Sequence, residues 1–313
     1  MADLNPSQPL LSASFAHRLT KATIKTKSVL CVGIDPHPGL MPALFGGQNQ
    51  IPGSAKAIQN LEAFCQTILE ATTGLVPAIK PQVAFFERHG PEGFHVLASL
   101  AAEAKNRELI VIMDAKRGDI GTTAQAYAEA WLGPEAIFKA DALTLNPYLG
   151  YDSLEPFIRR AQQTLSGVFI LVRTSNPGSA DLQQLLIDGK PAWAHMAVGL
   201  EKMVAEQIDQ SCDLSSVGIV MGATGPGDAL AVRKLLPAAP FLIPGYGAQG
   251  ARAEEAVSGL TADKQKGVYK GGLVNASRAI THGDGVQNAR TVGEAVAAMK
   301  TAIRQAVLDL TVI

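Results

Sequence analysis

The chain has 313 residues, and its 27 basic side chains nearly balance 28 acidic ones, which leaves a formal net charge of −1. This balance argues against the basic surface of a nucleic-acid-binding protein or of a polybasic membrane contact. Hydrophobic residues make up 47% and charged residues 18% of the chain, which predicts a globular protein with a sizeable core. No apolar stretch approaches the ~20 residues that a membrane-spanning helix needs, and residues 1–15 lack the pattern of a signal peptide. We therefore expect a cytoplasmic protein.

In chain order, the hydrophobic pattern predicts a leader helix at residues 10–27 and then eight short apolar runs that end in polar or glycine-rich segments. Their content of Val, Ile and Leu is typical of strands that are buried on both faces. The predicted strands are 28–35, 75–82, 108–116, 140–148, 167–175, 216–223, 241–247 and 271–278. Helical periodicity is clear between several of them, at 56–71, 92–106, 122–132 and 152–164, and 39–55 is predicted to be a loop.

Eight alternations of strand and helix predict an α/β fold, a single (β/α)8 TIM barrel that spans residues 1–313 as one domain. The alternative is an open doubly wound sheet, whose usual dinucleotide signal is G-x-G-x-x-G after an early strand. The first predicted strand ends instead in Gly33-Ile-Asp-Pro36. We therefore favour the barrel, with the leader helix covering one of its ends.

Polar side chains gather at the carboxyl ends of the predicted strands, where TIM-barrel enzymes place their chemistry. The bodies of the same strands are apolar, and a purely structural role does not explain this one-ended distribution. The polar residues at the strand ends are Asp35, Lys80, Asp114, Lys116, Asn146, Arg173, Thr174, Ser175, Asn275, Ser277 and Arg278.

The third predicted strand carries the most informative motif, Asp114-Ala-Lys116, with Asp119 three residues beyond it. Alternation along a strand puts Asp114 and Lys116 on the same face. Two carboxylates beside one lysine hold it as an ammonium ion. An ammonium ion is a poor nucleophile, because Schiff-base chemistry needs the neutral amine, but it can give a proton to a carbanion. The alternative is a surface ion-pair network. Such a network would not have to lie at the end of an apolar strand in the predicted active-site rim, where these three residues lie.

The loops after the seventh and eighth predicted strands are the usual place for phosphate in a TIM barrel. The glycine-rich segment 244–250, which includes Gln249, can bring backbone N–H groups close to an anion. Asn275-Ala-Ser-Arg278 precedes a short helix, whose amino end favours anions, and Arg278 can grip a phosphate with two hydrogen bonds. Turn formation is the alternative explanation for the glycines. Together, the two loops and Arg278 predict a phosphate site.

These motifs resemble those of a known family. Asp114-Ala-Lys-Arg-Gly-Asp-Ile120 with Thr123 matches the pattern D-x-K-x-x-D-I-x-x-T of the orotidine 5'-phosphate decarboxylases. The resemblance is closest to the longer bacterial branch (type 2), which shares the segments Lys80-Pro-Gln-x-Ala-Phe-Phe-Glu87 and Arg173-Thr-Ser-Asn-Pro177 with this chain. It covers nearly the whole chain. The pattern in the third strand is shared with sister enzymes, whereas its combination with Lys80 is much more specific.

The resemblance implies conversion of orotidine 5'-phosphate to uridine 5'-phosphate (UMP) and CO2 in de novo pyrimidine biosynthesis, with no metal and no cofactor. Lys116 would protonate C6 of the pyrimidine as CO2 leaves. Lys80, Asp114, Lys116 and Asp119 would form an alternating charged tetrad, in which Asp119 reaches the neighbouring subunit of a homodimer with shared active sites. The implied substrate-binding residues are Asp35 and Lys80 for the ribose, Thr123 from the neighbouring subunit, Ser175 for the amide edge of the pyrimidine, and Gln249 and Arg278 for the phosphate.

Two alternatives stay open at this point. A magnesium-dependent sugar-phosphate lyase of the same superfamily would share the barrel, the phosphate loops and the D-x-K-x-x-D motif. Such relatives place a carboxylate metal ligand at the end of the second strand, where this chain has Lys80, and a lysine would repel the ion. A catalytically silent barrel that only binds nucleotides would have no need for the acid–lysine–acid arrangement.

Overall fold

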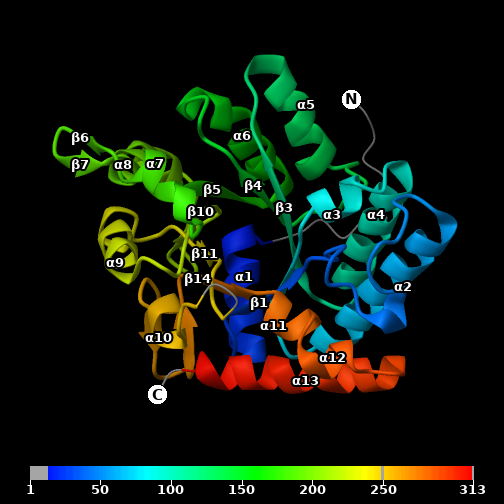
Figure 1. Cartoon of the computed structure of the whole chain (residues 1–313). Helices are drawn as coiled ribbons and strands as arrows, with labels where there is room; N and C mark the ends of the chain where they lie inside the picture. The colour runs from blue at the N-terminus through cyan, green and yellow to red at the C-terminus, as the bar shows by residue number, and fades with distance from the viewer. Residues whose placement is uncertain (1–12, 248–249, 312–313) are drawn as a thin grey trace.

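The computed structural model describes residues 13–247 and 250–311. Eight parallel strands close into a barrel in the order β1-β14-β11-β10-β5-β4-β3-β2, with helices around it (Figure 1). The barrel strands are β1 (Leu30–Ile34), β2 (Ala78–Pro81), β3 (Ile110–Arg117), β4 (Ala142–Leu145), β5 (Gly167–Arg173), β10 (Val217–Met221), β11 (Phe241–Ile243) and β14 (Gly272–Ala276). The predicted TIM barrel is confirmed.

Every barrel strand coincides with one of the predicted apolar runs, although β3 continues to Arg117, one residue beyond the predicted 108–116. Three additional hairpins are absent from the prediction. Their strands contain only two or three residues, too few to show an alternating pattern. The hairpins are β6 (Leu186–Ile187) with β7 (Lys190–Pro191), β8 (Ile208–Asp209) with β9 (Leu214–Ser215), and β12 (Thr261–Asp263) with β13 (Val268–Lys270).

The four helices predicted between strands are all present. Three of them lie within one residue of their expected bounds, whereas the helix predicted at 152–164 begins at Glu155. The four helices are α2 (Ala55–Thr72), α4 (Pro91–Asn106), α5 (Gly121–Leu132) and α6 (Glu155–Thr164), the last preceded by the 3-10 turn η2 (Tyr151–Leu154). The expected loop 39–55 contains one 3-10 turn, η1 (Ala43–Phe45). No helix in the described ranges is long and apolar enough to cross a membrane.

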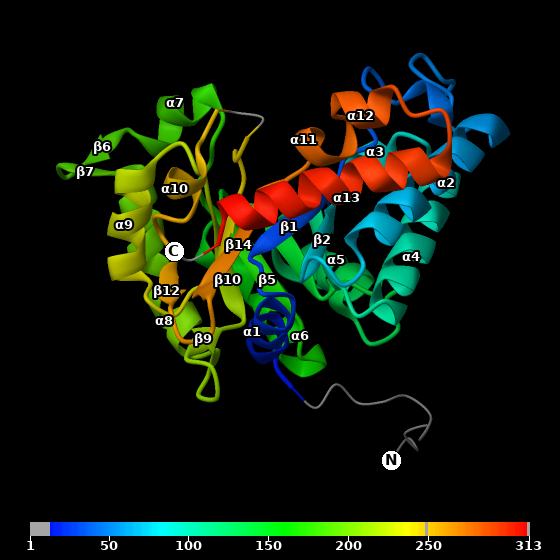
Figure 2. The ribbon, with the colours of Figure 1, turned by 90° about the horizontal axis from the view of Figure 1, so that it is seen from below.

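Further helices lie outside the barrel, most of them in the second half of the chain. Figure 2 shows the longest of these, α13 (Val292–Asp309), lying across the outside of the barrel and reaching α2. Its N-cap residue is Thr291, whose hydroxyl accepts a hydrogen bond from the backbone N–H of Glu294 at 3.2 Å. The other elements are α3 (Ala84–Glu87), η3 (Pro177–Ser179), α7 (Ala180–Gln183), α8 (Ala192–Ala205), α9 (Pro226–Leu235), α10 (Ala253–Ala256), α11 (Arg278–Thr281) and α12 (Asp284–Gln287).

The leader helix, α1 (Phe15–Thr26), closes the amino end of the barrel. Phe15 and Leu19 belong to the same buried cluster as the inward-facing strand residues, and the Phe15 ring meets Phe169 edge-on at 5.8 Å between centroids. A Cβ atom on Gly167 would lie 2.3 Å from the Phe15 ring, so only glycine leaves room for it. The predicted helix 10–27 thus begins at Phe15 in the described part, and residues 10–12 lie outside it. The leader helix thus covers the amino end of the barrel, as the sequence predicts.

Candidate active site

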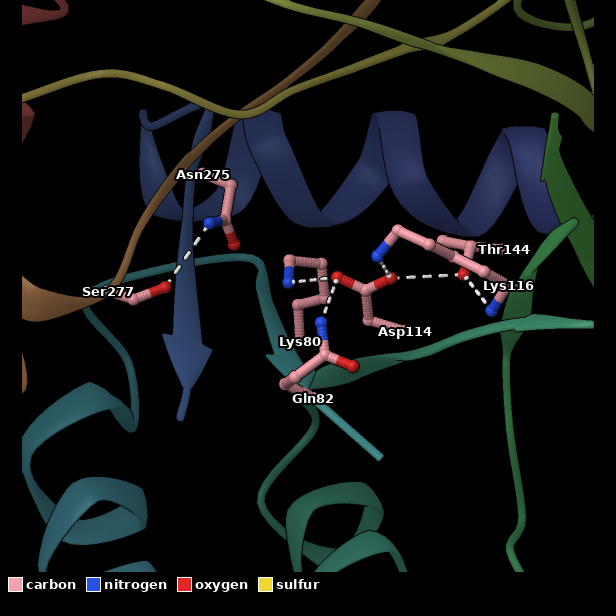
Figure 3. A network of polar contacts seen from close by, with 7 residues as sticks. All are labelled: Lys80, Gln82, Asp114, Lys116, Thr144, Asn275 and Ser277. Atoms are coloured by element: carbon pink, nitrogen blue, oxygen red, sulfur yellow. Dashed lines mark hydrogen bonds and ion pairs between the residues drawn. The ribbon is translucent and has the colours of Figure 1, made fainter. Parts of the chain in front are cut away.

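Asp114 is the centre of a polar network at the carboxyl rim (Figure 3). Lys80 donates a hydrogen bond from its Nζ atom to Asp114 Oδ2 at 2.6 Å, and Lys116 Nζ donates to Asp114 Oδ1, also at 2.6 Å. Gln82 Nε2 donates to Oδ2 at 3.2 Å, and the Thr144 hydroxyl donates to Oδ1 at 3.1 Å. Each carboxylate oxygen therefore accepts from one ammonium group and one neutral donor.

The two lysines differ in their exposure to solvent. The side chain of Lys80 is 6% exposed and that of Asp114 is 10% exposed, whereas that of Lys116 is 44% exposed. Burial opposes the charged forms of both Lys80 and Asp114. The charge of Asp114, with that of Asp35, outweighs burial and raises the pKa of Lys80, and the two ammonium groups lower the pKa of Asp114. The buried pair stays ionised, and Lys116 is the more exposed of the two lysines.

Lys116 occupies an unusual backbone conformation. Its φ angle is +46°, in the left-handed region that residues with a Cβ rarely adopt, and the β3–β4 register shifts between Met113 and Arg117. The Lys116 N–H donates to the Thr144 hydroxyl at 2.9 Å, which stabilises the bend. Simple alternation predicted that Asp114 and Lys116 share a face. The structure does bring them together, but through a local departure from regular strand geometry of the kind often found at functional sites.

Two buried oxygen atoms beside this network have no hydrogen-bond partner within the described chain: Oδ1 of Asp35 and Oδ1 of Asn275. Asp35 follows β1, and Asn275 lies in β14 on the neighbouring side, where its Nδ2 atom donates to the Ser277 hydroxyl at 3.3 Å. A Cβ atom on Gly33 would lie 1.9 Å from that hydroxyl, so glycine is required for Ser277 to reach this position. Unsatisfied buried acceptors cost free energy, and hydroxyl groups of a ligand can satisfy both of these.

Asp119 and Thr123 lie away from this network. The Asp119 carboxylate accepts a hydrogen bond from the N–H of Ile120 at 2.8 Å, and within the described ranges it forms no salt bridge with Lys116. Thr123 is exposed in the first turn of α5. The expectation that two carboxylates of one chain flank Lys116 is therefore met only by Asp114.

The remaining residues of the predicted site lie on other parts of the rim. Ser175 is half-buried just after β5, and Arg278 is exposed at the first position of α11, directly after β14. Gly245 and Gly247 after β11 both have positive φ angles, +106° and +72°, a backbone conformation that favours glycine and that fits the alternative of turn formation. Gln249 lies outside the described residues.

Two residues of the site were missed by the sequence analysis as candidates: Gln82 and Thr144. Gln82 forms a bridge with Asp114 immediately after β2, and Thr144 is a buried hydroxyl in β4. A polar residue inside or directly after a buried strand was the available signal. Asn275, which lies in β14, was recognised at the sequence level as one of the polar residues at the strand ends.

Comparison with known proteins places this arrangement in a family. The model of the "Orotidine 5'-phosphate decarboxylase / HUMPS family" matches residues 28–292. The orotidine 5'-phosphate decarboxylase of Rhodopirellula baltica is 40% identical over 271 residues, covering 85% of this chain and 88% of the relative. The chain belongs to the orotidine 5'-phosphate decarboxylase / HUMPS family.

Other members of the family agree with the match over nearly the full length. The orotidine 5'-phosphate decarboxylase of Roseiflexus castenholzii is 40% identical over 294 residues, covering 93% of this chain and 95% of the relative. The solved structure of Leishmania donovani OMP decarboxylase covers 95% of this chain and 97% of its own, with 30% identity and a TM-score of 0.71. Lys80, Asp114 and Lys116, the three charged residues that contact one another at the carboxyl rim, lie within the matched range 28–292.

Proposed function

We propose that this chain decarboxylates orotidine 5'-phosphate to UMP, with Lys116 as the proton donor. The observation that carries the proposal is the pair of ion pairs that Lys80 and Lys116 form with Asp114 at the carboxyl rim of the barrel. The barrel matches the model of the decarboxylase family. The arrangement presents one ammonium group to a ligand and holds it with a buried carboxylate. The relatives that match over most of the chain bear the name of this activity.

The chemistry follows from the charges. The bond between C6 and the carboxylate breaks, its electron pair stays on C6 in the plane of the ring, CO2 leaves, and a proton from Lys116 Nζ forms the new C6–H bond. The ring's π system cannot delocalise an in-plane electron pair. A fixed positive charge beside C6 stabilises it, and because Asp114 already orients the ammonium group, little reorganisation is needed during the reaction.

The same site offers partners for the rest of the nucleotide. The buried Oδ1 atoms of Asp35 and Asn275 support binding of the ribose hydroxyls, because both atoms accept hydrogen bonds and have none from the described protein. Arg278 at the start of α11, across from the glycine-containing segment after β11, supports a phosphate site. Phosphate binding far from C6 can then position the pyrimidine against Lys116.

Lys80 distinguishes this proposal from the magnesium-dependent sugar-phosphate lyase. A magnesium site there would need carboxylate oxygens free to coordinate the ion. Here the buried ammonium of Lys80 occupies one oxygen of Asp114, and Lys116 and Thr144 occupy the other. The carboxylate that could coordinate a magnesium ion at the ends of β2 and β3 is thus already neutralised by two lysine side chains.

An ultraviolet assay of the purified protein tests the proposal. Orotidine 5'-phosphate and UMP absorb differently, so conversion is followed directly, with and without excess EDTA. We expect complete conversion at a rate that the chelator does not change. Folded protein that leaves orotidine 5'-phosphate intact would refute the proposal, and activity restored by added magnesium on a sugar phosphate would favour the lyase. Tight UMP binding without turnover would favour the silent barrel.

Replacing Arg278 with alanine should weaken binding of UMP far more than binding of uridine. A bidentate, charge-assisted contact between an arginine and a phosphate accounts for about 10- to 100-fold in affinity. The measurement is the dissociation constant of each ligand by isothermal titration calorimetry, with Arg290→Ala as the control because Arg290 is an exposed arginine farther along the same chain segment. Equal losses for UMP and uridine would count against phosphate binding at Arg278.

We further propose a homodimer in which Asp119 and Thr123 contribute to the active site of the neighbouring subunit. Large apolar side chains are exposed around them: Ile120 is 59% exposed and Tyr148 is 80% exposed. The loops after β3 and β4 are packed together, because a Cβ atom on Gly118 would lie 2.8 Å from the Asn146 carbonyl oxygen. An apolar surface beside an active-site rim fits burial against a second copy of the chain.

Mixing inactive variants tests this shared site. Lys116→Ala and Asp119→Ala protein are each expected to be nearly inactive, and a mixed dimer has one site with both original residues. After subunit exchange, random assortment predicts recovery of about a quarter of wild-type activity. The control mixture of Lys116→Ala with Asp114→Asn should recover nothing, since both residues come from one subunit. No recovery in the first mixture, despite proven exchange, would contradict the shared site.

A further inference from the structure

Ser175 lies in a loop whose position is fixed by several side-chain hydrogen bonds. The loop leaves β5 at Arg173 and passes through η3 into α7, which lies on the α9 side of the barrel in Figure 1. Resemblance to the family assigns the amide edge of the pyrimidine to Ser175 but gives Arg173 no role. Arg173 is the last residue of β5 and its side chain is only 12% exposed, which is unusual for an arginine.

The Arg173 guanidinium joins three separate segments. Its Nε atom donates to Asp228 Oδ2 in the first turn of α9 at 3.1 Å. Its Nη1 atom donates to the Thr174 carbonyl oxygen at 2.6 Å and to the hydroxyl of Ser179, a buried residue, at 2.5 Å. The rigid, planar fork of donors on an arginine can satisfy these acceptors together, which a lysine ammonium on its flexible stem cannot do with the same geometry.

The two residues that precede Ser175 make further hydrogen bonds. Gln183 accepts a hydrogen bond from the Thr174 N–H and donates one to the Thr174 hydroxyl, both at 2.8 Å. The carbonyl oxygen of Arg173 accepts from the N–H of Gly222 at 2.7 Å. A Cβ atom on Gly222, the residue directly after β10, would lie 2.9 Å from the Ser175 backbone nitrogen, so the two segments pack against each other with no room for a side chain at position 222.

We propose that Arg173, anchored by Asp228, is a positioning residue that holds Ser175 at the pyrimidine edge and so determines selectivity for the base of the nucleotide. The inference rests on the proposed decarboxylase function. Arg173 touches no part of the substrate; it acts through the Thr174 carbonyl and the Ser179 hydroxyl, which bracket Ser175 in the chain. The contact between Arg173 and Asp228 is an ion pair, because the charged carboxylate accepts a hydrogen bond from the charged guanidinium.

A double-mutant cycle on Arg173→Met and Ser175→Ala tests this role. We expect Arg173→Met to lower kcat/KM for orotidine 5'-phosphate by about 10- to 100-fold, the effect of losing a charge-assisted anchor at a contact residue. In protein that already carries Ser175→Ala, the same substitution should change kcat/KM by less than about 2-fold, since the residue it positions is gone. Inhibition by ribose 5-phosphate, which lacks the pyrimidine, should stay unchanged in both variants.

Two further variants keep the test decisive. Asp228→Asn removes the anchoring charge while leaving Arg173 in place, and it serves as the test if Arg173→Met does not fold. It should also lower kcat/KM for orotidine 5'-phosphate without changing inhibition by ribose 5-phosphate. Arg107→Met breaks a comparable pair with Glu103, 2.8 Å long and far from the rim, and should have wild-type kinetics. Additive losses in the cycle, or an equal loss of ribose 5-phosphate inhibition, would overturn the inference. Wild-type protein that does not turn over orotidine 5'-phosphate would instead refute the proposed function itself.

Discussion

Replacement of Lys116 with alanine is expected to lower kcat for orotidine 5'-phosphate by at least about 10⁴-fold, because the variant loses both the proton donor and the positive charge beside C6. UMP should still bind, since the ribose and phosphate partners are unchanged. The fold should also persist, because the Lys116 side chain is 44% exposed and supports no buried contact other than Asp114. Single-turnover measurement of orotidine 5'-phosphate loss gives the rate without interference from product release.

The control for this substitution is Lys25→Ala, which removes a lysine paired with Glu108 at 2.7 Å on an exposed surface. It should leave kcat unchanged. A Lys116→Ala variant that retains more than a tenth of wild-type kcat would exclude Lys116 as the proton donor and would direct attention to another acid at the rim.

The second large effect is expected from Asp114→Asn, which leaves the buried Lys80 ammonium without its carboxylate. Removing one partner of a buried ion pair costs about 3–5 kcal/mol of folding free energy, because the remaining charge is uncompensated. Activity should fall as well, since Lys116 loses the acceptor that holds it at 2.6 Å. Urea denaturation followed by circular dichroism measures the first effect, and the ultraviolet assay measures the second.

The stability difference between wild type and Asp114→Asn should depend on pH in a defined direction. The pKa of Asp114 is lowered in the folded protein against burial by the charges of Lys80 and Lys116. Its contribution is therefore fully present above the unfolded pKa of about 3.9 and shrinks as the pH falls below that value. A difference that instead grows below pH 4 would mean that Asp114 is not the charged partner of Lys80. Glu108→Gln, in the exposed pair with Lys25, should leave the unfolding midpoint unchanged.

Much of the barrel could be predicted from the sequence because its strands are buried on both faces. Runs such as 108–116 and 167–175 are nearly continuous in apolar residues and end in charged ones, so both the strand and its functional end are visible. The leader helix and its position over one end of the barrel were predicted as well. Which end it covers depends on the contact between Phe15 and Phe169, which are 154 positions apart in the chain and which no local pattern connects.

The site itself was only partly predictable. Lys80, Asp114 and Lys116 are charged groups at the ends of apolar strands, and the structure brings them together. Two features could not be read from the pattern. The left-handed backbone of Lys116 follows from the register shift against β4 and the Thr144 hydroxyl, a tertiary effect. Asp119 lies away from Lys116 in its own chain, and the resemblance to the family, not the residue spacing, gave the expectation that it acts elsewhere.

The most direct test of the central claim is exchange of the C6 proton of UMP with solvent. By microscopic reversibility, a Lys116 that delivers a proton to C6 can also remove it from the product, and in D2O the exchange places deuterium at C6. Proton NMR of UMP incubated with the protein follows this loss of signal. Our account predicts exchange with wild-type protein and none with Lys116→Ala at saturating UMP. Exchange at the wild-type rate in the variant would contradict it.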